Sequence, residues 1–525
     1  MAKAKPQPKS TRTPRVFQQA KVSHPAGLGG KYRRVVGEFW TERQRQMNPL
    51  HYVISYRASF KPELPAYFIE RLCPAGGVVY DPFCGRGTTA LQANLMGRSA
   101  AASDVNPLAV RMVAAKCQPV SLEAITARLA EVDWDADIST DGEPLDNLAP
   151  FYHPKTLRQL LNLREFLKQS EILRDCSKDT GHLVGPGGAK ALSRGRKPPE
   201  ARVRIPSPEG ATAAPLSPLR GLQDLGRDTG GLRPRLCTFG PSGLIRSSGP
   251  LCNDATVSIA RVDRFIELVA LSRLHGHSDG FFSVYSFPQI SVPASGQRRI
   301  NRQRNQKPEF RPVAERIIKK ARLALAETDI DKLNAASRAN RFFVASANDI
   351  PKKSLPDNSV DLIVTSPPFL AKANYLLDNW LEFWFAGIDP APLAKTLVQT
   401  PSLKTWRDFI GQSMRQMARV LRPGGHAVIE VGEIEHDGQV LHLDEVILEL
   451  AANITSGGVS GKRNIRGPAR HRQRQLELWP TADSPLAVVE VLIHTQKFTK
   501  LANCFKISNN EKGTNTNRLV VLRKI

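Results

Sequence analysis

Short apolar runs alternate with helix-like stretches in two separate blocks of this chain. In the first block, "GGVVYDPFCGRGTTALQANLMGRSAAASDVNPLAVRMVAAK" predicts strand, Gly-rich turn, helix, strand, turn and helix. The strands are apolar along their length, which is typical of parallel strands that are covered on both faces. The alternation returns at residue 341. We therefore predict an α/β fold with a mostly parallel, doubly wound sheet that a long insertion interrupts.

The second block carries the same pattern to the end of the chain. Strands are predicted in "RFFVASANDIP" and "DLIVTSPPF", and a helix is predicted around residues 376–386. A helix followed by a strand is predicted in "WRDFIGQSMRQMARVLRPGGHAVIEVG". The last predicted strands are "LAVVEVLIHTQ" and "NRLVVLRKI".

The segments outside the two blocks have different compositions. Residues 1–35 form a basic arm that we expect to be disordered, and residues 121–180 read as a helical insertion. Residues 181–252 are predicted to be disordered, because positions 181–250 hold 13 Gly and 10 Pro with Phe239 as their one aromatic residue. Such a segment buries too little apolar area to offset its ordering entropy. Residues 253–340 are helical and basic in pattern.

The charge balance indicates an anionic partner. The 525 residues include 74 Lys and Arg against 49 Asp and Glu, a formal net charge of +25. Nucleic acid is the simplest polymer of opposite charge, so residues 253–340 become the candidate recognition segment. Within it, candidate phosphate contacts are Arg298, Arg299, Arg302 and Arg304. The alternative interpretation is a solvated helix face.

Several kinds of site are not supported by the sequence. The seven cysteines are scattered without a CxxC pair, which argues against zinc and disulfides and fits a reducing cytoplasm. His275 and His277 form an HxH pair without an evident third ligand, so we expect no metal. No apolar run approaches 18 residues, so no membrane span is expected.

The stretch "VVYDPFCGRGTTAL" has the features of a ligand-binding turn. The predicted strand ends at Asp81, Gly85 and Gly87 make the turn tight, and a helix begins near Thr88. Ligands of open α/β sheets bind outside the carboxyl ends of the strands, where glycines allow close approach to the backbone. No Lys follows the glycines as in a phosphate loop. An acid at the strand end instead suits a ligand with an ammonium group.

Asp104 ends the next predicted strand, 17 residues after Gly87. An acid at this place in a doubly wound fold receives ribose hydroxyls. The alternative is that Asp104 caps the helix that follows it.

The stretch "TSPPF" suits a flat aromatic amine. The rigid Pro367-Pro368 step holds backbone carbonyls in a fixed direction after a strand. The hydroxyl of Ser366 and a carbonyl can accept hydrogen bonds from an exocyclic NH2 group, and Phe369 can stack on the ring. The alternative is a turn that merely ends the strand.

Together these residues resemble the S-adenosylmethionine-dependent DNA amino-methyltransferases, the N4-cytosine/N6-adenine group. "DPFCGRGTT" is similar to their cofactor loop, "SYRASFKPELPAYFIERL" to the segment over the methionine part, and "TSPPF" to their catalytic tetrad. The resemblance implies a Rossmann-like methyltransferase fold, with a cofactor-binding half at 36–120 and a catalytic half at 341–525. It implies cofactor contacts from Asp81, Pro82, Phe83, Gly85, Gly87, Thr88 and Asp104. It implies base contacts from Ser366, Pro367, Pro368 and Phe369.

The Ser form of the tetrad is typical of the N4-cytosine enzymes. The resemblance therefore implies a site-specific methyltransferase for cytosine N4 in double-stranded DNA, of the restriction-modification or orphan type, in a bacterial cytoplasm. A cognate restriction endonuclease would be a further partner. Adenine N6, an amino group in RNA and an inactive nucleic-acid-binding relic stay open as alternatives. The chain departs from many N4-cytosine enzymes by placing the cofactor loop first, and Ser346 stands where relatives often carry an acid for the adenine ring.

Overall fold

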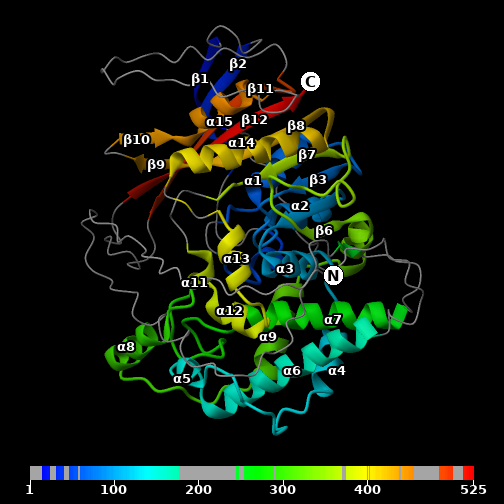
Figure 1. Cartoon of the computed structure of the whole chain (residues 1–525), viewed down its shortest axis with the longest axis vertical. Coiled ribbons are helices and arrows are strands. Elements are labelled where there is room, and N and C mark those ends of the chain that lie inside the picture. Colours follow the sequence, from blue (N-terminus) through cyan, green and yellow to red (C-terminus); the bar gives the residue numbers. More distant parts are fainter. Residues whose placement is uncertain are drawn as a thin grey trace, which may run out of the picture.

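The fold is described from a computed structural model of the chain. The structure describes residues 15–23, 31–40, 47–56, 59–176, 244–246, 254–288, 290–368, 374–398, 400, 402–436, 439–454, 484–499 and 512–525. A mixed sheet lies at one end of the molecule, and a layer of helices lies at the other (Figure 1).

The large sheet has ten strands in the order β1-β2-β11-β12-β8-β7-β3-β4-β6-β5. In that order the strands cover Arg15–Ser23, Lys31–Glu38, Leu486–Thr499, Lys512–Lys524, Leu421–Val431, Val360–Thr365, Val78–Asp81, Ser99–Asp104, Arg341–Val344 and Leu244–Arg246. The five strands from β8 to β6 are parallel to one another, and antiparallel pairs occur on both sides of them. A separate antiparallel pair consists of β9 (Glu433–His436) and β10 (Gln439–His442). The predicted α/β fold with a parallel sheet centre is confirmed.

Helices cover both faces of the sheet centre. Successive strand residues enter different apolar cores, because side chains alternate between the faces of a strand. Val79 and Leu362 belong to one core, whereas Tyr80 and Ile363 belong to the other. The first face is covered by α1 (Glu63–Leu72), α2 (Thr88–Leu95) and α3 (Pro107–Cys117). The second face is covered by α14 (Leu403–Val420) and α15 (Leu443–Ala452).

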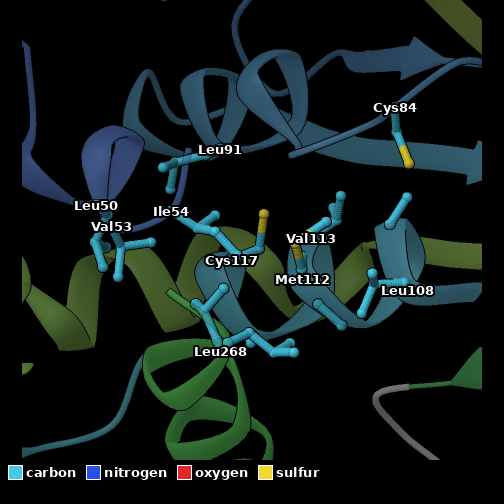
Figure 2. Packing of buried hydrophobic residues seen from close by; sticks show 14 of the residues in the cluster. Leu50, Val53, Ile54, Cys84, Leu91, Leu108, Met112, Val113, Cys117 and Leu268 are labelled. Atoms are coloured by element: carbon cyan, nitrogen blue, oxygen red, sulfur yellow. The ribbon is translucent and has the colours of Figure 1, made fainter. Parts of the chain in front are cut away.

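A second helical layer packs against α3. It contains α4 (Leu122–Ala130), α5 (Leu145–Leu148), α6 (Pro154–Cys176), α7 (Asp254–Leu271), α8 (Ala294–Arg304), α9 (Val313–Leu325) and α10 (Ile330–Ala336). Figure 2 shows Met112 and Val113 of α3 between Leu91 of α2 and Leu268 of α7. The remaining short helices are η1 (Pro49–Tyr52), η3 (Ser337–Ala339), α11 (Tyr375–Asp378), α12 (Trp380–Phe385) and α13 (Ala391–Thr396). Helix α3 therefore joins the sheet to the insertion helices.

The prediction that residues 1–35 are disordered is wrong for residues 15–23 and 31–35, which lie in β1 and β2. Strand β2 pairs in parallel with β11 and buries Val35. Arg33 of β2 also donates to Glu490 at 3.1 Å, although Glu490 lies 457 positions further along the chain. Local composition misses this strand because distant tertiary pairing stabilises it.

The predicted disordered insertion is described only at residues 244–246. These three residues form β5, which pairs antiparallel with β6 at the edge of the sheet. The expectation of disorder is therefore wrong for these three residues, because their backbone pairs with β6. The rest of residues 181–252 lies outside the described residues.

The docking of β2 can be tested with Val35→Ala. Val35 is 1% exposed, and removing its two methyl groups is expected to lower the free energy of unfolding by roughly 1–3 kcal/mol. The matched control is Val489→Ala in β11, where the side chain is 38% exposed. Denaturant unfolding measures both variants. Equal stability of the two would show that the N-terminal strand contributes nothing to the fold.

Candidate active site

A pocket opens where the strand ends of β3, β4 and β7 come together. It holds about 850 Å³ of empty space, part of which is open to solvent. The predicted site residues on its wall are Asp81, Pro82, Phe83, Gly85, Thr88, Asp104, Ser366 and Pro368. The two motifs predicted from sequence therefore meet in one cavity.

Three predicted residues have other positions. Gly87 belongs to the loop after β3 but faces Val113 of α3, and Pro367 is buried between two wall residues. Phe369 lies outside the described residues. Its proposed stacking on a base therefore stays a prediction.

The two glycines of the loop after β3 are needed for different reasons. Gly87 has φ +78°, and a Cβ there would lie 2.6 Å from a methyl carbon of Val113 on α3. Glycine is required at position 87 because the turn packs so closely on α3 that a side chain would not fit. Gly85 has φ +46°, and a Cβ there would lie 3.6 Å from the ring of Tyr56, inside the pocket wall. Its missing side chain leaves room for a ligand at the backbone.

Asp81 at the end of β3 is a buried acceptor. Its Oδ1 accepts the hydroxyl of Thr365 at 2.6 Å and the N–H of Phe83 at 3.1 Å. Burial raises the pKa of Asp81 to about 7, although these hydrogen bonds oppose the shift. The carboxyl group is therefore poised between its neutral and charged forms near neutral pH, and a nearby cation would favour the charged form.

Asp104 occupies the matching place at the end of β4. Its two carboxylate oxygens accept the N–H groups of Gly85 at 3.0 Å and Asn106 at 2.9 Å. Burial raises the pKa of Asp104 to about 6. The alternative that Asp104 caps α3 is wrong, because the N-cap is Asn106, whose side chain accepts the N–H of Leu108.

The pocket has an acidic and aromatic wall within a strongly basic chain. Asp81 and Asp104 line it, and no Lys, Arg or His is found among its described lining residues. Aromatic rings come from Tyr56, Phe60 and Tyr375. A cation with a flat ring suits this wall, because carboxylates balance positive charge and aromatic faces attract it. S-adenosylmethionine carries a sulfonium, an ammonium group and an adenine ring, so the residues present fit it.

Sequence motifs did not identify all of the wall. Tyr375, residues 396–398 and Phe409 follow the "TSPPF" stretch and belong to no motif, yet they line the pocket. The ring of Phe409 meets that of Phe83 edge-on at 5.9 Å. Ser346 also lines the wall, whereas Asp349, three residues further on, is exposed. The segment that resembles the methionine cover did contain wall residues, because Tyr56, Ser59 and Phe60 of that segment line the pocket.

The four arginines of α8 lie outside this pocket. All four are exposed, and α8 packs through the fully buried Gln297. Arg298 donates to the carbonyl of Asp146 at 2.6 Å, and the guanidinium of Arg304 lies 3.8 Å from the ring centre of Tyr285. Helix α8 therefore presents a cationic surface, and contacts with Asp146 and Tyr285 hold two of its arginines in place.

His275 has a structural role, because both of its ring nitrogens are used in hydrogen bonds within the protein. Its ring nitrogens lie 2.9 Å from the carbonyl oxygen of Phe287 and 2.9 Å from a carboxylate oxygen of Glu382. No group of three or more His, Cys, Asp or Glu that could hold a metal ion occurs among the residues the structure describes. Within that same part of the chain, the helices are too short or too polar to cross a membrane.

Comparisons with known proteins point to one family. Residues 3–115, which contain the cofactor loop and Asp104, match a family model described as DNA methylase. A Type II methyltransferase of Methanocaldococcus jannaschii, M.MjaII, is 28% identical over 141 residues, or 26% of each chain. The chain thus matches about a quarter of the length of that relative. The predicted resemblance to DNA amino-methyltransferases is confirmed.

The raised carboxyl pKa values predict pH-dependent binding of a cation. A bound cation lowers the pKa of Asp81 from about 7, so binding releases protons and weakens as the pH falls. We expect the Kd for S-adenosylmethionine to rise on the order of tenfold or more from pH 7.5 to pH 5.5. Calorimetry in buffers of different ionisation enthalpy counts the released protons. The dependence should flatten in Asp81→Asn, and an equally steep dependence in that variant would contradict the assignment.

Proposed function

Because the chain resembles the DNA amino-methyltransferases and residues 3–115 match the DNA methylase model, we propose that it methylates an exocyclic amino group in DNA with S-adenosylmethionine as methyl donor. The observation that carries this proposal is the single pocket shared by Gly85 and Ser366. A donor held by the first loop and an amine held by the second would lie side by side there.

The first loop would hold the cofactor. S-adenosylmethionine supplies, when bound, an electrophilic methyl carbon on a positively charged sulfur. Asp81 and Asp104 place carboxyl groups at neighbouring strand ends, and Asp104 is the proposed acceptor for the ribose hydroxyls. Pro82, Phe83 and Thr88 would complete this wall. Gly87 would act indirectly, by fixing the turn against α3.

The second loop would hold the target amine. The Ser366 hydroxyl and a backbone carbonyl of residues 366–368 can accept its two N–H groups, and Phe369 is the proposed stacking partner for the ring. These acceptors gain interaction as the nitrogen becomes positive during attack, which favours the transition state over the ground state. The extra proton can leave afterwards, so no strong base is required. The target nucleotide must first leave the duplex, at a cost of a few kcal/mol.

Cytosine N4 is the proposed target atom. Ser at position 366, rather than Asp, supports N4 of cytosine over N6 of adenine by resemblance. We further propose a restriction-modification or orphan role, with a cognate restriction endonuclease in the first case; the curated relative is named a Type II methyltransferase.

The reaction is tested by incubating the protein with unmethylated plasmid DNA and methyl-labelled S-adenosylmethionine. Nucleoside mass spectrometry should find labelled N4-methylcytosine. Labelled N6-methyladenine would overturn the cytosine assignment and leave the amino-methyltransferase. Two results would overturn the DNA activity if the protein still binds the cofactor. The first is label in RNA but not in DNA, and the second is label in neither polymer.

Ser366→Ala tests the second loop. The loss of one acceptor should reduce turnover by about 100-fold, because a single well-placed hydrogen bond in the transition state contributes that much. The Kd for S-adenosylmethionine should change less than twofold, as the cofactor is held by the other loop. A parallel loss of cofactor affinity would contradict the assigned role.

The DNA backbone is proposed to contact α8. Its sequence "ASGQRRINRQR" has four arginines and no acidic residue, and all four side chains are exposed. Phosphate contacts of this kind add sequence-independent affinity and help to offset the cost of nucleotide extrusion. Arg298, Arg299, Arg302 and Arg304 are the residues assigned to this contact.

The Arg299→Ala/Arg302→Ala double variant tests this surface. Losing two phosphate contacts should reduce the slope of log Kd against log salt concentration by about 1.8 for duplex DNA. The control is Lys332→Ala/Lys353→Ala, which removes two exposed charges away from α8. Fluorescence anisotropy at several salt concentrations measures both. Equal slopes in the two double variants would remove α8 from the interface.

A further inference from the structure

The segment Ser366-Pro367-Pro368 cannot hold itself in place through its own backbone donors. Both prolines lack an N–H group, so neither can join a strand ladder or close a turn by donating. A loop that positions a reacting amine must nevertheless be fixed closely, since a 1 Å misplacement costs about 100-fold in rate. The two prolines stiffen the segment locally, so its position in the pocket depends on the groups that hold its two ends.

The first anchor lies directly before the segment. Thr365 is fully buried and donates to Asp81, which is 1% exposed, at 2.6 Å. Thr89 of α2 adds a second tie, because its hydroxyl donates to the carbonyl of Val364 at 3.0 Å. The end of β7 is thus fixed to the loop and helix of the cofactor side.

The second anchor lies at the far end of the segment. The indole N–H of Trp406 donates to the carbonyl of Pro368 at 2.8 Å. Trp406 is 2% exposed and packs in the second core with Ile410 and Met414 of its own helix, α14. Its ring therefore cannot swing away without disrupting that core, and a buried indole N–H needs an acceptor.

We propose that Thr365 and Trp406 are positioning residues that fix the two ends of Ser366-Pro367-Pro368 and so aim its acceptors at the target amine. This inference rests on the proposed function. Pro368 already accepts from Trp406, which occupies one of the two lone pairs of its carbonyl and holds that carbonyl toward the anchor. The acceptors left for the amine are then the Ser366 hydroxyl and the carbonyl of Ser366 or Pro367.

Trp406→Phe tests the second anchor, because it keeps an aromatic ring in the core and removes the donor. The matched control is Trp380→Phe: Trp380 donates its indole N–H to the carbonyl of Val292 at 3.0 Å, away from the pocket. Single-turnover methyl transfer should fall about 100-fold in Trp406→Phe. It should stay within twofold of wild type in Trp380→Phe. The Kd for S-adenosylmethionine should be unchanged in both.

The first anchor is tested with Thr365→Val and Thr365→Ser. Valine keeps the volume and loses the hydroxyl, whereas serine keeps the hydroxyl. Turnover should fall in the valine variant and recover in the serine variant. In the wild type, the hydrogen bond from Thr365 lowers the pKa of Asp81. Thr365→Val removes this bond and raises that pKa, so the pH at which cofactor binding is half lost should also rise. Equal turnover in both variants would overturn the role of the hydroxyl.

Hydrogen–deuterium exchange separates this proposal from the proposed function. Peptides that contain Ser366 should exchange several-fold faster in Trp406→Phe and Thr365→Val than in Trp380→Phe. A wild-type protein without methyl transfer would overturn the function, and the exchange result would still decide the anchoring. If Trp406→Phe shows the same exchange and the same turnover as Trp380→Phe, the anchoring role is overturned, whereas the proposed function is not.

Discussion

The hydrogen bond from Thr365 to Asp81 joins the ends of two neighbouring parallel strands, and the pocket depends on that joint. It brings the loop after β3 and the loop after β7 to one cavity although the two residues are 284 positions apart. Asp81 both lines the pocket and accepts the hydrogen bond that holds the end of β7. A ligand that contacts Asp81 in one half of the pocket would therefore also affect the geometry of the other half, because both depend on the same carboxyl group.

The parts that local sequence specifies could be predicted. Strand, turn and helix around Gly85 follow from hydrophobic period and from glycines, so β3, α2 and β4 appear where expected, and Asp81 and Asp104 stand at their strand ends. The N-terminal strands could not be predicted, because β2 is stabilised by β11 from the other end of the chain. Tyr375, Phe409 and Trp406 were missed as site residues for a related reason. Their sequences indicate helix faces, and only the folded chain shows that Tyr375 and Phe409 line the pocket and that Trp406 bonds the Pro368 carbonyl.

Charge is divided between the two layers of the molecule. The helical layer carries the arginines of α8, whereas the pocket at the sheet has two carboxyl groups and, in its described wall, no basic side chain. A polyanion and a small cation can therefore be bound by the same protein without competing for the same residues. Helix α3 packs against both layers, and Figure 2 shows it between α2 and α7. The helical layer is thus fixed to the sheet through α3, the helix that packs against Gly87.

The separation of β3 and β7 along the chain also affects how the protein is made. At about 5–20 residues per second, the ribosome needs roughly 15 to 60 s to synthesise the residues between Asp81 and Thr365. A β3–β4 pair that forms within that interval leaves open the edge that β7 covers in the folded protein. An apolar open edge is a template for aggregation. Shielding of that edge until β7 is made would favour correct folding of the amino-terminal half.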